Sequence, residues 1–177
     1  AAGALAWAGM EWIFRGKPSV LGAASGLVAG LVCITPAAGF VNLMPAIVIG
    51  LAAGIVCYFA CTALKGAMGY DDSLDAFGVH GVGSITGMLM LGFLANADVN
   101  SAIAATFQVN GAAVSLAGGA GQFLNQLKAV LFTIALAAVG TAAARVAARS
   151  PRVAVVAVVR RAEVDAARRR PLATPDV

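Results

Sequence analysis

The sequence predicts an all-α integral membrane protein, a polytopic bundle of apolar helices. The 177 residues are 60% hydrophobic and only 11% charged, whereas soluble domains carry about a quarter charged residues. The apolar residues also gather in long runs, and a helix that crosses a bilayer needs about 20 of them. No Lys, Arg, Asp or Glu occurs between Pro18 and Leu64. This chain has too few polar residues to cover a soluble core.

Five apolar segments are predicted to be helical. The first is too short to span a bilayer, and we expect it to be the end of a helix that starts upstream. The second and third are separated by a turn, because Pro36 and Gly39 interrupt the helical pattern. The fourth contains His80, the only histidine of the chain. The predicted segments are residues 1–14, 20–35, 43–64, 76–97 and 121–148.

The basic residues of the loops predict the orientation of these segments. If the segments alternate in direction, five basic residues fall on one side, and the positive-inside rule makes that side cytoplasmic. Lys128 is the exception, and the opposite loops hold Asp98 in a neutral stretch, residues 96–119. We therefore expect a multi-pass cell-membrane protein with a cytoplasmic C-terminus. The five basic residues are Arg15, Lys17, Lys65, Arg145 and Arg149.

Glycines recur at four-residue spacing in three of the segments. This spacing places small residues on one helix face and lets two helices approach closely. Many unrelated membrane bundles use the same device, so the pattern predicts packing and not a function. The glycines are Gly22, Gly26 and Gly30, then Gly50 and Gly54, then Gly83 and Gly87.

His80 has two interpretations at this stage. A neutral imidazole can make a structural hydrogen bond between helices, or it can mark a pathway, as ionisable residues inside a membrane often do. At helical spacing its face carries Ala76, Phe77, Gly83, Ser84, Gly87 and Leu91, which leaves room for a small solute or another helix backbone. The opposite face, with Val82, Ile85 and Leu89, suits packing or lipid.

Other polar and aromatic residues receive structural interpretations. Cys33, Cys57 and Cys61 are expected to be small packing residues, and no metal or other cofactor is expected. Trp7 and Trp12 are expected to anchor at the membrane interface. Glu11 is expected to pair with a basic residue such as Arg15. No set of nucleophile and base, and no pair of carboxylates within the membrane, indicates an enzyme.

Three stretches of the sequence resemble one family. DDSLDAFGVHGVGS, residues 71–84, closely resembles the second signature of the ammonium transporters, the Amt, Mep and Rh proteins. EWIFRGKPSVLGAASGLVAGLVCITPAAGFV, residues 11–41, and the hydrophobic pattern of the fifth segment agree in order and spacing. The resemblance extends to about Ala148. The GKPS and ITPAAG motifs are more similar to the bacterial Amt branch than to Rh.

The resemblance implies a fold and a mechanism. Family members have eleven helices per subunit, built from two inverted five-helix repeats and a final helix, and they assemble as trimers with one apolar pore per subunit. The five segments are similar to helices seven to eleven, so His80 matches the second of two pore histidines. An apolar pore penalises a charged ion, and desolvation favours the neutral form of an amine. Deprotonation of ammonium at the paired imidazoles would then exclude potassium.

The resemblance also implies roles for the neighbours of His80 and for regions outside this chain. Phe77, Gly83, Ser84 and Gly87 are expected to support the pore. Asp75 matches an acidic position of the family and either orders the inner mouth or caps a helix. The first pore histidine, the phenylalanine gate and the outer recruitment groups lie, in the family, before helix seven. We therefore expect a C-terminal portion of a transporter.

The end of the chain differs from the family pattern. Residues from Arg145 onward hold eight of the twelve basic residues and carry a net charge of +5. Two interpretations remain open: a basic cytoplasmic tail that is solvated or touches lipid headgroups, or a change of reading frame near Ala148. The second would remove coupling to neighbouring subunits and to a PII-type regulator. The predicted domains are a transmembrane domain, residues 1–148, and a tail, residues 149–177; no nucleic-acid partner is expected.

Two functions are compatible with these features. The first is transmembrane transport of ammonium or ammonia by an incomplete subunit. The second is a non-conducting membrane subunit that senses ammonium or serves a structural role. Transport through the complete protein, and its change on replacing His80, would distinguish them.

Overall fold

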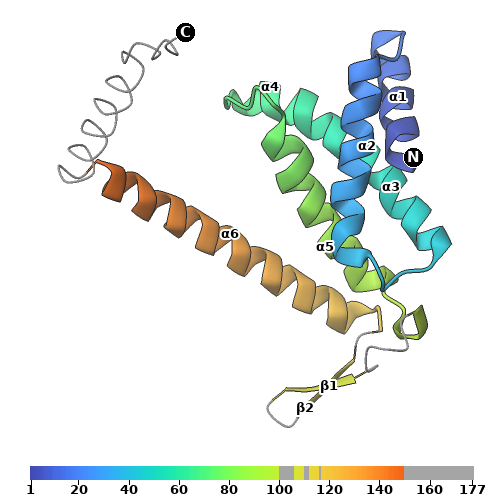
Figure 1. Ribbon diagram of the computed structural model, residues 1–177, viewed down its shortest axis with the longest axis vertical. Helices are drawn as coiled ribbons and strands as arrows, with labels where there is room; N and C mark the ends of the chain where they lie inside the picture. The colour runs from blue at the N-terminus through green and yellow to red at the C-terminus, as the bar shows by residue number, and fades with distance from the viewer. Residues whose placement is uncertain (100–105, 110–111, 116, 150–177) are drawn as a thin grey trace, which may run out of the picture. The chain divides into compact units, whose positions relative to one another are not determined.

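The computed structural model describes residues 1–99, 106–109, 112–115 and 117–149, and it is mostly helical (Figure 1). Four helical stretches in this part are long and apolar enough to cross a membrane: Val20–Ala37, Leu43–Met68, Phe77–Leu94 and Ala120–Ala148. The first predicted segment forms a helix of only 14 residues. The all-α fold class and the four spanning segments are thus confirmed, and the fourth segment ends three residues earlier than predicted.

The helices include several irregular turns. Two stretches of π-helix, η2 and η3, interrupt the third and fourth predicted segments, and short 3₁₀ turns, η1 and η4, follow the second and the fourth. The α-helices are α1 (Ala2–Arg15), α2 (Val20–Ile34), α3 (Leu43–Phe59), α4 (Lys65–Met68), α5 (Val82–Leu94) and α6 (Ala120–Ala148). The irregular turns are η1 (Thr35–Ala37), η2 (Ala60–Leu64), η3 (Phe77–Gly81) and η4 (Ala97–Val99).

Turn residues set several of these boundaries. Gly16 ends α1 in the left-handed conformation, with φ 76°, and its N–H donates to the carbonyl of Trp12. Ser19 then begins α2, because its hydroxyl accepts a hydrogen bond from the N–H of Gly22 at 2.9 Å. Such caps satisfy backbone groups that a helix end leaves without partners. Pro36 lies in η1, where the predicted break occurs.

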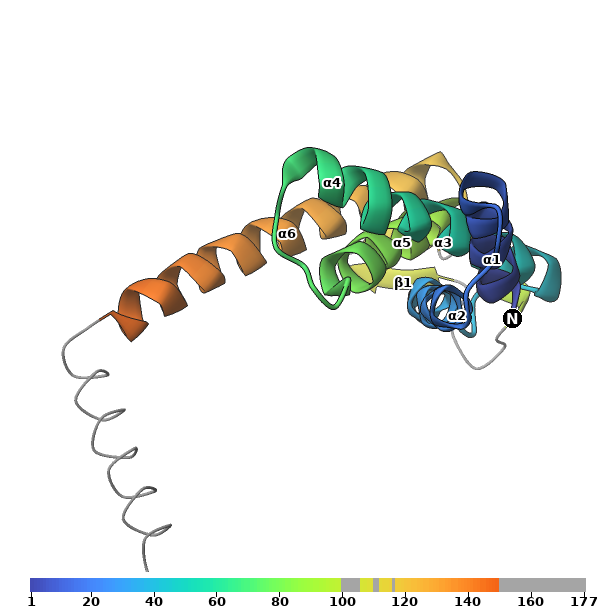
Figure 2. The same ribbon diagram turned by 90° about the horizontal axis from the view of Figure 1, so that it is seen from above.

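Residues 1–131 form one compact unit. In it, α2 and α3 pack against each other, and both contact α1 and α5 (Figures 1 and 2). The core is lined by small and aliphatic side chains, and among them Cys33, Ile49 and Cys57 are fully buried. This arrangement places the start of α5, and with it His80, against the central pair of helices.

Glycines bring these helices into close contact, as the four-residue spacing predicts. A Cβ atom added to Gly26 of α2 would lie 2.6 Å from the carbonyl oxygen of Gly3 in α1. One added to Gly54 of α3 would overlap that same oxygen, and one added to Gly87 of α5 would overlap the carbonyl oxygen of Cys33. The backbones therefore approach too closely for any larger residue.

The two tryptophans occupy different environments. Trp7 is only 5% exposed and packs edge-on against Tyr58, with ring centroids 5.7 Å apart. Trp12 is 66% exposed on the surface of the bundle. The expectation of an interface anchor is therefore wrong for Trp7, because the helix turns this ring toward α3 and into the core.

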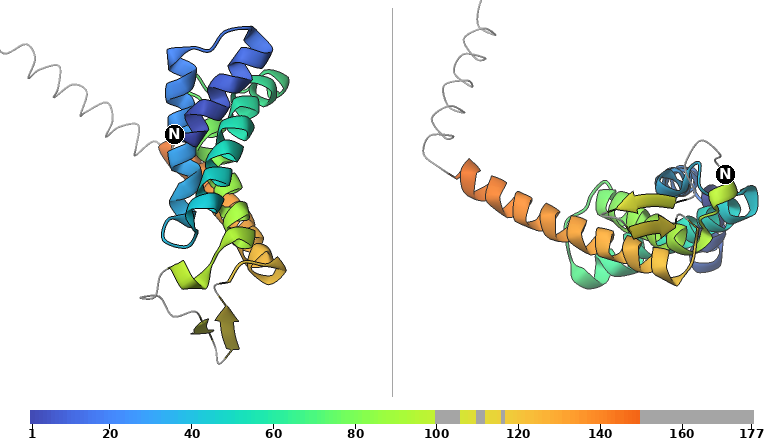
Figure 3. Two further views of the ribbon diagram at one scale, coloured as in Figure 1. Left: turned by 90° about the vertical axis from the view of Figure 1, so that its right-hand side faces the viewer. Right: turned by 90° about the horizontal axis from the view of Figure 1, so that it is seen from below.

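A β-hairpin interrupts the neutral stretch that precedes α6. Strands β1 (Thr106–Val109) and β2 (Ala112–Ser115) pair antiparallel, at the end of the bundle where α5 ends (Figure 3). The sequence pattern predicts only a loop in this stretch. The start of α6 packs on α5 through stacked rings of Phe93 and Phe123, 4.4 Å apart. The rest of α6, residues 132–148, belongs to a second unit, and the basic tail beyond Arg149 lies outside the described residues.

Candidate functional site around His80

His80 lies in the π-helix η3, which leads directly into α5. The segment begins with Asp72, whose carboxylate accepts hydrogen bonds from the N–H groups of Ala76, Phe77 and Gly78 at 2.8, 2.9 and 3.2 Å. A negative charge at a helix N-terminus is favoured by the helix dipole. The acidic residues before His80 are expected to suit a helix N-terminus, and Asp72, rather than Asp75, supplies that cap.

Asp75 instead binds a lysine of the preceding span. The Lys65 Nζ atom donates to the Asp75 carboxylate at 2.7 Å and to the backbone carbonyl of Asp72 at 2.6 Å. The backbone of Asp75 is left-handed, with φ 53°, a conformation that few residues other than glycine adopt and that Asp tolerates better than most. The Lys65 side chain, at the start of α4, thus connects the preceding span to the start of the His80 segment.

The imidazole of His80 is on the surface of the bundle. Its side chain is exposed, and among the described residues it has no hydrogen-bond partner. It lines a shallow open pocket together with Ser25 and Val28 of α2, and with Leu74 and Asp75 of the loop before η3. The interhelical hydrogen bond that the structural interpretation requires is not found within the described part of the chain.

The other predicted site residues divide between two environments. Gly83 and Gly87 are buried, and their open faces are filled by Cys57 and Val32 at Gly83 and by the backbone of Cys33 at Gly87. They therefore give room to neighbouring helices rather than to a solute. Ser84, one turn beyond His80, is exposed.

Phe77 connects the site to the loop. Its ring is half exposed and packs edge-on against Tyr70, with centroids 5.5 Å apart. The Tyr70 hydroxyl is buried and lacks a hydrogen-bond partner among the described residues. Burial, and the nearby carboxylate of Asp72, raise the pKa of Tyr70, because both disfavour a phenolate.

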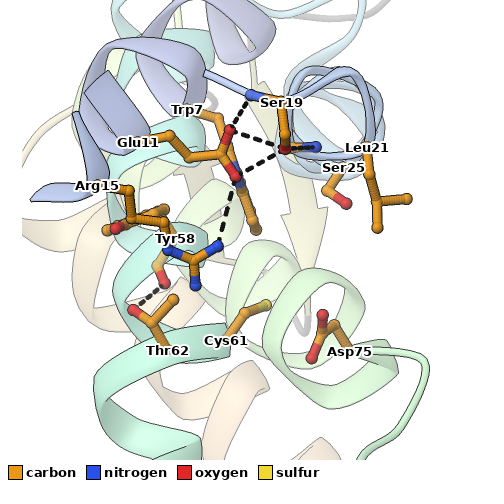
Figure 4. Close-up of a pocket in the computed structure, with 11 residues that line it drawn as sticks. Trp7, Glu11, Arg15, Ser19, Leu21, Ser25, Tyr58, Cys61, Thr62 and Asp75 are labelled. Carbon is orange, nitrogen blue, oxygen red and sulfur yellow. Dashed lines mark hydrogen bonds and ion pairs between the residues drawn. The ribbon is translucent and has the colours of Figure 1, made fainter. Parts of the chain in front are cut away.

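A second, polar pocket lies beside the first, at the end of the bundle that holds the Lys65 contact. It has a volume of about 140 Å³, and Ser25, Thr62, Cys61 and Asp75 contribute to its lining (Figure 4). Glu11 reaches this pocket from α1 although it is 3% exposed. The end of α1, the start of α2, the end of α3 and the start of the His80 segment meet here.

Sequence reasoning missed two contributors to this site. Lys65 anchors the loop, and Cys57 contacts the backbone beside His80. The acidic DDSLD stretch was a signal for a helix cap, although it could not distinguish between three aspartates. For Cys57 and Lys65 no local signal exists, because their partners lie on other segments.

The fold and site together define a polytopic membrane protein whose exposed histidine lies near the start of one span, beside α2. A family model described as the Ammonium Transporter Family matches residues 1–150. This chain belongs to the ammonium transporter family.

Sequence relatives agree with this assignment. The chain is 45% identical over 139 residues to an ammonium transporter of Aquifex aeolicus, covering 78% of this chain and 30% of that protein. It is 52% identical over 102 residues to an ammonium transporter of Bacillus subtilis, covering 58% of this chain and 25% of that protein. The chain therefore spans 30% or less of the length of these curated relatives.

Solved structures show the same fold. Saccharomyces cerevisiae Mep2 is similar with a TM-score of 0.66 and 34% identity, over 76% of this chain and 30% of that one. A Mep2 mutant from Candida albicans is similar with a TM-score of 0.71 and 30% identity, over 85% of this chain and 33% of that one.

Proposed function

We propose that this chain forms part of an ammonium transporter in which His80 lines the conducting pore. The observation that carries the proposal is the exposed imidazole, which has no hydrogen-bond partner in the described part of the chain and lies beside Ser25 and Asp75. The relatives are named ammonium transporters, which supports ammonium or ammonia as the transported solute. A non-conducting, ammonium-sensing subunit is the alternative that transport measurements address.

The proposed selectivity step is deprotonation of ammonium. Stripping water from a cation in an apolar passage is unfavourable, and it favours the neutral amine. A neutral imidazole offers one acceptor nitrogen for the released proton and one donor nitrogen for a partner. Potassium has no proton to release, so it would meet the full cost of desolvation.

The assembly of the complete protein is part of the same proposal. We infer a homotrimer in the cell membrane, with residues 1–148 in the membrane and a basic tail, residues 149–177, in the cytoplasm. Asp75, Phe77, Gly83, Ser84 and Gly87 would support the pore by fixing η3 and α5. A PII-type regulator on the cytoplasmic side and the surrounding lipid complete the set of proposed partners.

Replacing His80 tests the proposal. In the complete open reading frame that contains this chain, expressed in cells without other ammonium uptake, His80→Ala should lower the rate or the selectivity of ammonium uptake about 100-fold, the scale of a positioned proton acceptor. Uptake is measured in the presence and absence of potassium.

Thr86→Ala is the matched control. The Thr86 hydroxyl is satisfied within its own helix, donating to the carbonyl of Val82 at 2.8 Å, and this variant should transport normally. Unchanged ammonium uptake and unchanged potassium exclusion in His80→Ala would refute a pore role for His80. Absence of uptake in the unmodified protein would favour the non-conducting alternative.

A further inference from the structure

A thiol contacts the backbone immediately beside His80. The Sγ atom of Cys57, in α3, donates to the carbonyl oxygen of Val79 at 3.8 Å. That carbonyl belongs to the peptide bond whose nitrogen is the backbone nitrogen of His80. Cys57 is fully buried, so this weak hydrogen bond forms without competition from solvent.

Sulfur also fills the space left by a glycine two residues before His80. A Cβ atom added to Gly78 would lie 2.5 Å from the Sγ atom of Cys61. Cys61 lies in η2 and Gly78 in η3, so the two π-helices pack against each other at this contact. On the far side of His80, a Cβ atom on Gly83 would lie 3.3 Å from the Sγ atom of Cys57.

These contacts surround the one turn that carries the imidazole. In η3 the N–H of Val82 donates to the carbonyl of Phe77, five residues earlier, rather than four. Such π turns are rare, and they are frequently found at functional sites. The turn therefore needs support from outside its own helix, and Cys57 supplies it at the peptide bond adjoining His80.

We propose that Cys57 is a positioning residue, which holds the η3 turn through the Val79 carbonyl and so sets the direction of the His80 imidazole. The proposal rests on the proposed role of His80 in ammonium transport. Cys57 does not touch the solute and acts only through the backbone. A small donor is required at this place, because Gly83 and the buried surroundings leave no room for a longer polar side chain.

The test compares two equal truncations, one rescue and one alternative apolar substitution in the complete open reading frame. Cys57→Ala removes the donor, whereas Cys57→Ser restores a donor of similar size. Cys33→Ala is the matched control, because Cys33 is equally buried and its thiol has no hydrogen bond to η3 among the described residues. Cys57→Val also removes the donor, with a somewhat larger apolar side chain, and replaces Cys57→Ala if that variant does not accumulate in the membrane.

Two readouts are measured on each variant. The first is the nitrogen resonances of histidine-labelled protein, in which the His80 signals are assigned by their loss in His80→Ala. The second is the rate of ammonium uptake, measured with and without competing potassium. We expect Cys57→Ala to shift the His80 resonances and to lower uptake about tenfold, since small errors in the placement of a reacting group are costly.

The outcomes separate this proposal from the function on which it rests. Recovery of both readouts in Cys57→Ser, with Cys33→Ala unchanged, would support positioning. His80 resonances that stay fixed in Cys57→Ala, or that shift equally in Cys33→Ala, would overturn it. Shifted resonances in a protein that does not transport ammonium would support positioning and refute the transport function instead.

Discussion

At the scale of single residues, Glu11 is a buried charged group whose carboxylate accepts several hydrogen bonds. It is 3% exposed, and its carboxylate accepts hydrogen bonds from the backbone N–H and the hydroxyl of Ser19 at 2.6 to 3.0 Å. Ser19 in turn caps α2. The Arg15 guanidinium, which the sequence predicts as a partner, lies 3.8 Å away and is 60% exposed. Glu11 therefore joins α1 to α2 mainly through Ser19.

This difference predicts unequal effects of two substitutions. Glu11→Ala should destabilise the protein by about 1–3 kcal/mol, because it removes the hydrogen bonds that the buried Glu11 carboxylate accepts from Ser19. Arg15→Ala should change stability by about 0–1 kcal/mol, as for other exposed ion pairs. Thermal unfolding of the purified protein in detergent measures both. Equal destabilisation by the two substitutions would contradict this account of Glu11.

At the scale of elements, the contact of α5 with α2 depends on glycine. The position of Gly87 is occupied on its open side by the backbone carbonyl of Cys33, which has no flexible end that could move away. α5 must therefore shift as a whole if a side chain is added there. η3, which carries His80, leads directly into α5, so the packing of α5 on α2 affects the site as well as stability.

Gly87→Ala should accordingly destabilise the bundle by about 1–3 kcal/mol, the usual cost of overpacking. Gly66→Ala is the control, because an added Cβ atom at Gly66, in α4, meets nothing within 4 Å. That substitution should be neutral or slightly stabilising, since alanine favours helix more than glycine does. Thermal unfolding of the two variants in the same detergent measures both effects. A Gly87→Ala protein as stable as the unmodified protein would contradict the tight packing of α5 against α2.

At the scale of the whole molecule, the charges of the loops predict its direction in the membrane. In the structure, Lys65 and the aspartates of the loop before η3 lie at one end of the bundle, together with Arg15. The loop containing Asp98 follows the opposite end of α5. A basic end of this kind is expected to face the cytoplasm.

Labelling with a membrane-impermeant maleimide checks this orientation. In a background without native cysteines, Asp71→Cys should react only in inside-out vesicles and Asp98→Cys only in right-side-out vesicles. Both positions are exposed, so accessibility on the correct side should not limit either reaction. The reverse pattern of labelling would show that the orientation is inverted.

Much of the architecture could be predicted from local features. Hydropathy alone predicted the four spans, because each is a continuous apolar stretch whose length matches a bilayer. The four-residue glycine spacing predicted close helix contacts for a similar reason: helical periodicity places those residues on one face. The hairpin before α6 was not predicted. Each of its short strands is stabilised by pairing with the other strand more than by its own residues.

The sequence by itself determined the class of the protein, its spans and the segment that carries its single histidine, since these follow from composition and periodicity along the chain. Only the tertiary structure decided the partners: Lys65 with Asp75, Cys57 with the Val79 carbonyl, and the exposed position of His80. The physical reason is that a hydrogen bond or an ion pair joins groups far apart in sequence. Which groups meet depends on how the helices pack, and the residues that neighbour a group along the chain do not indicate its partner.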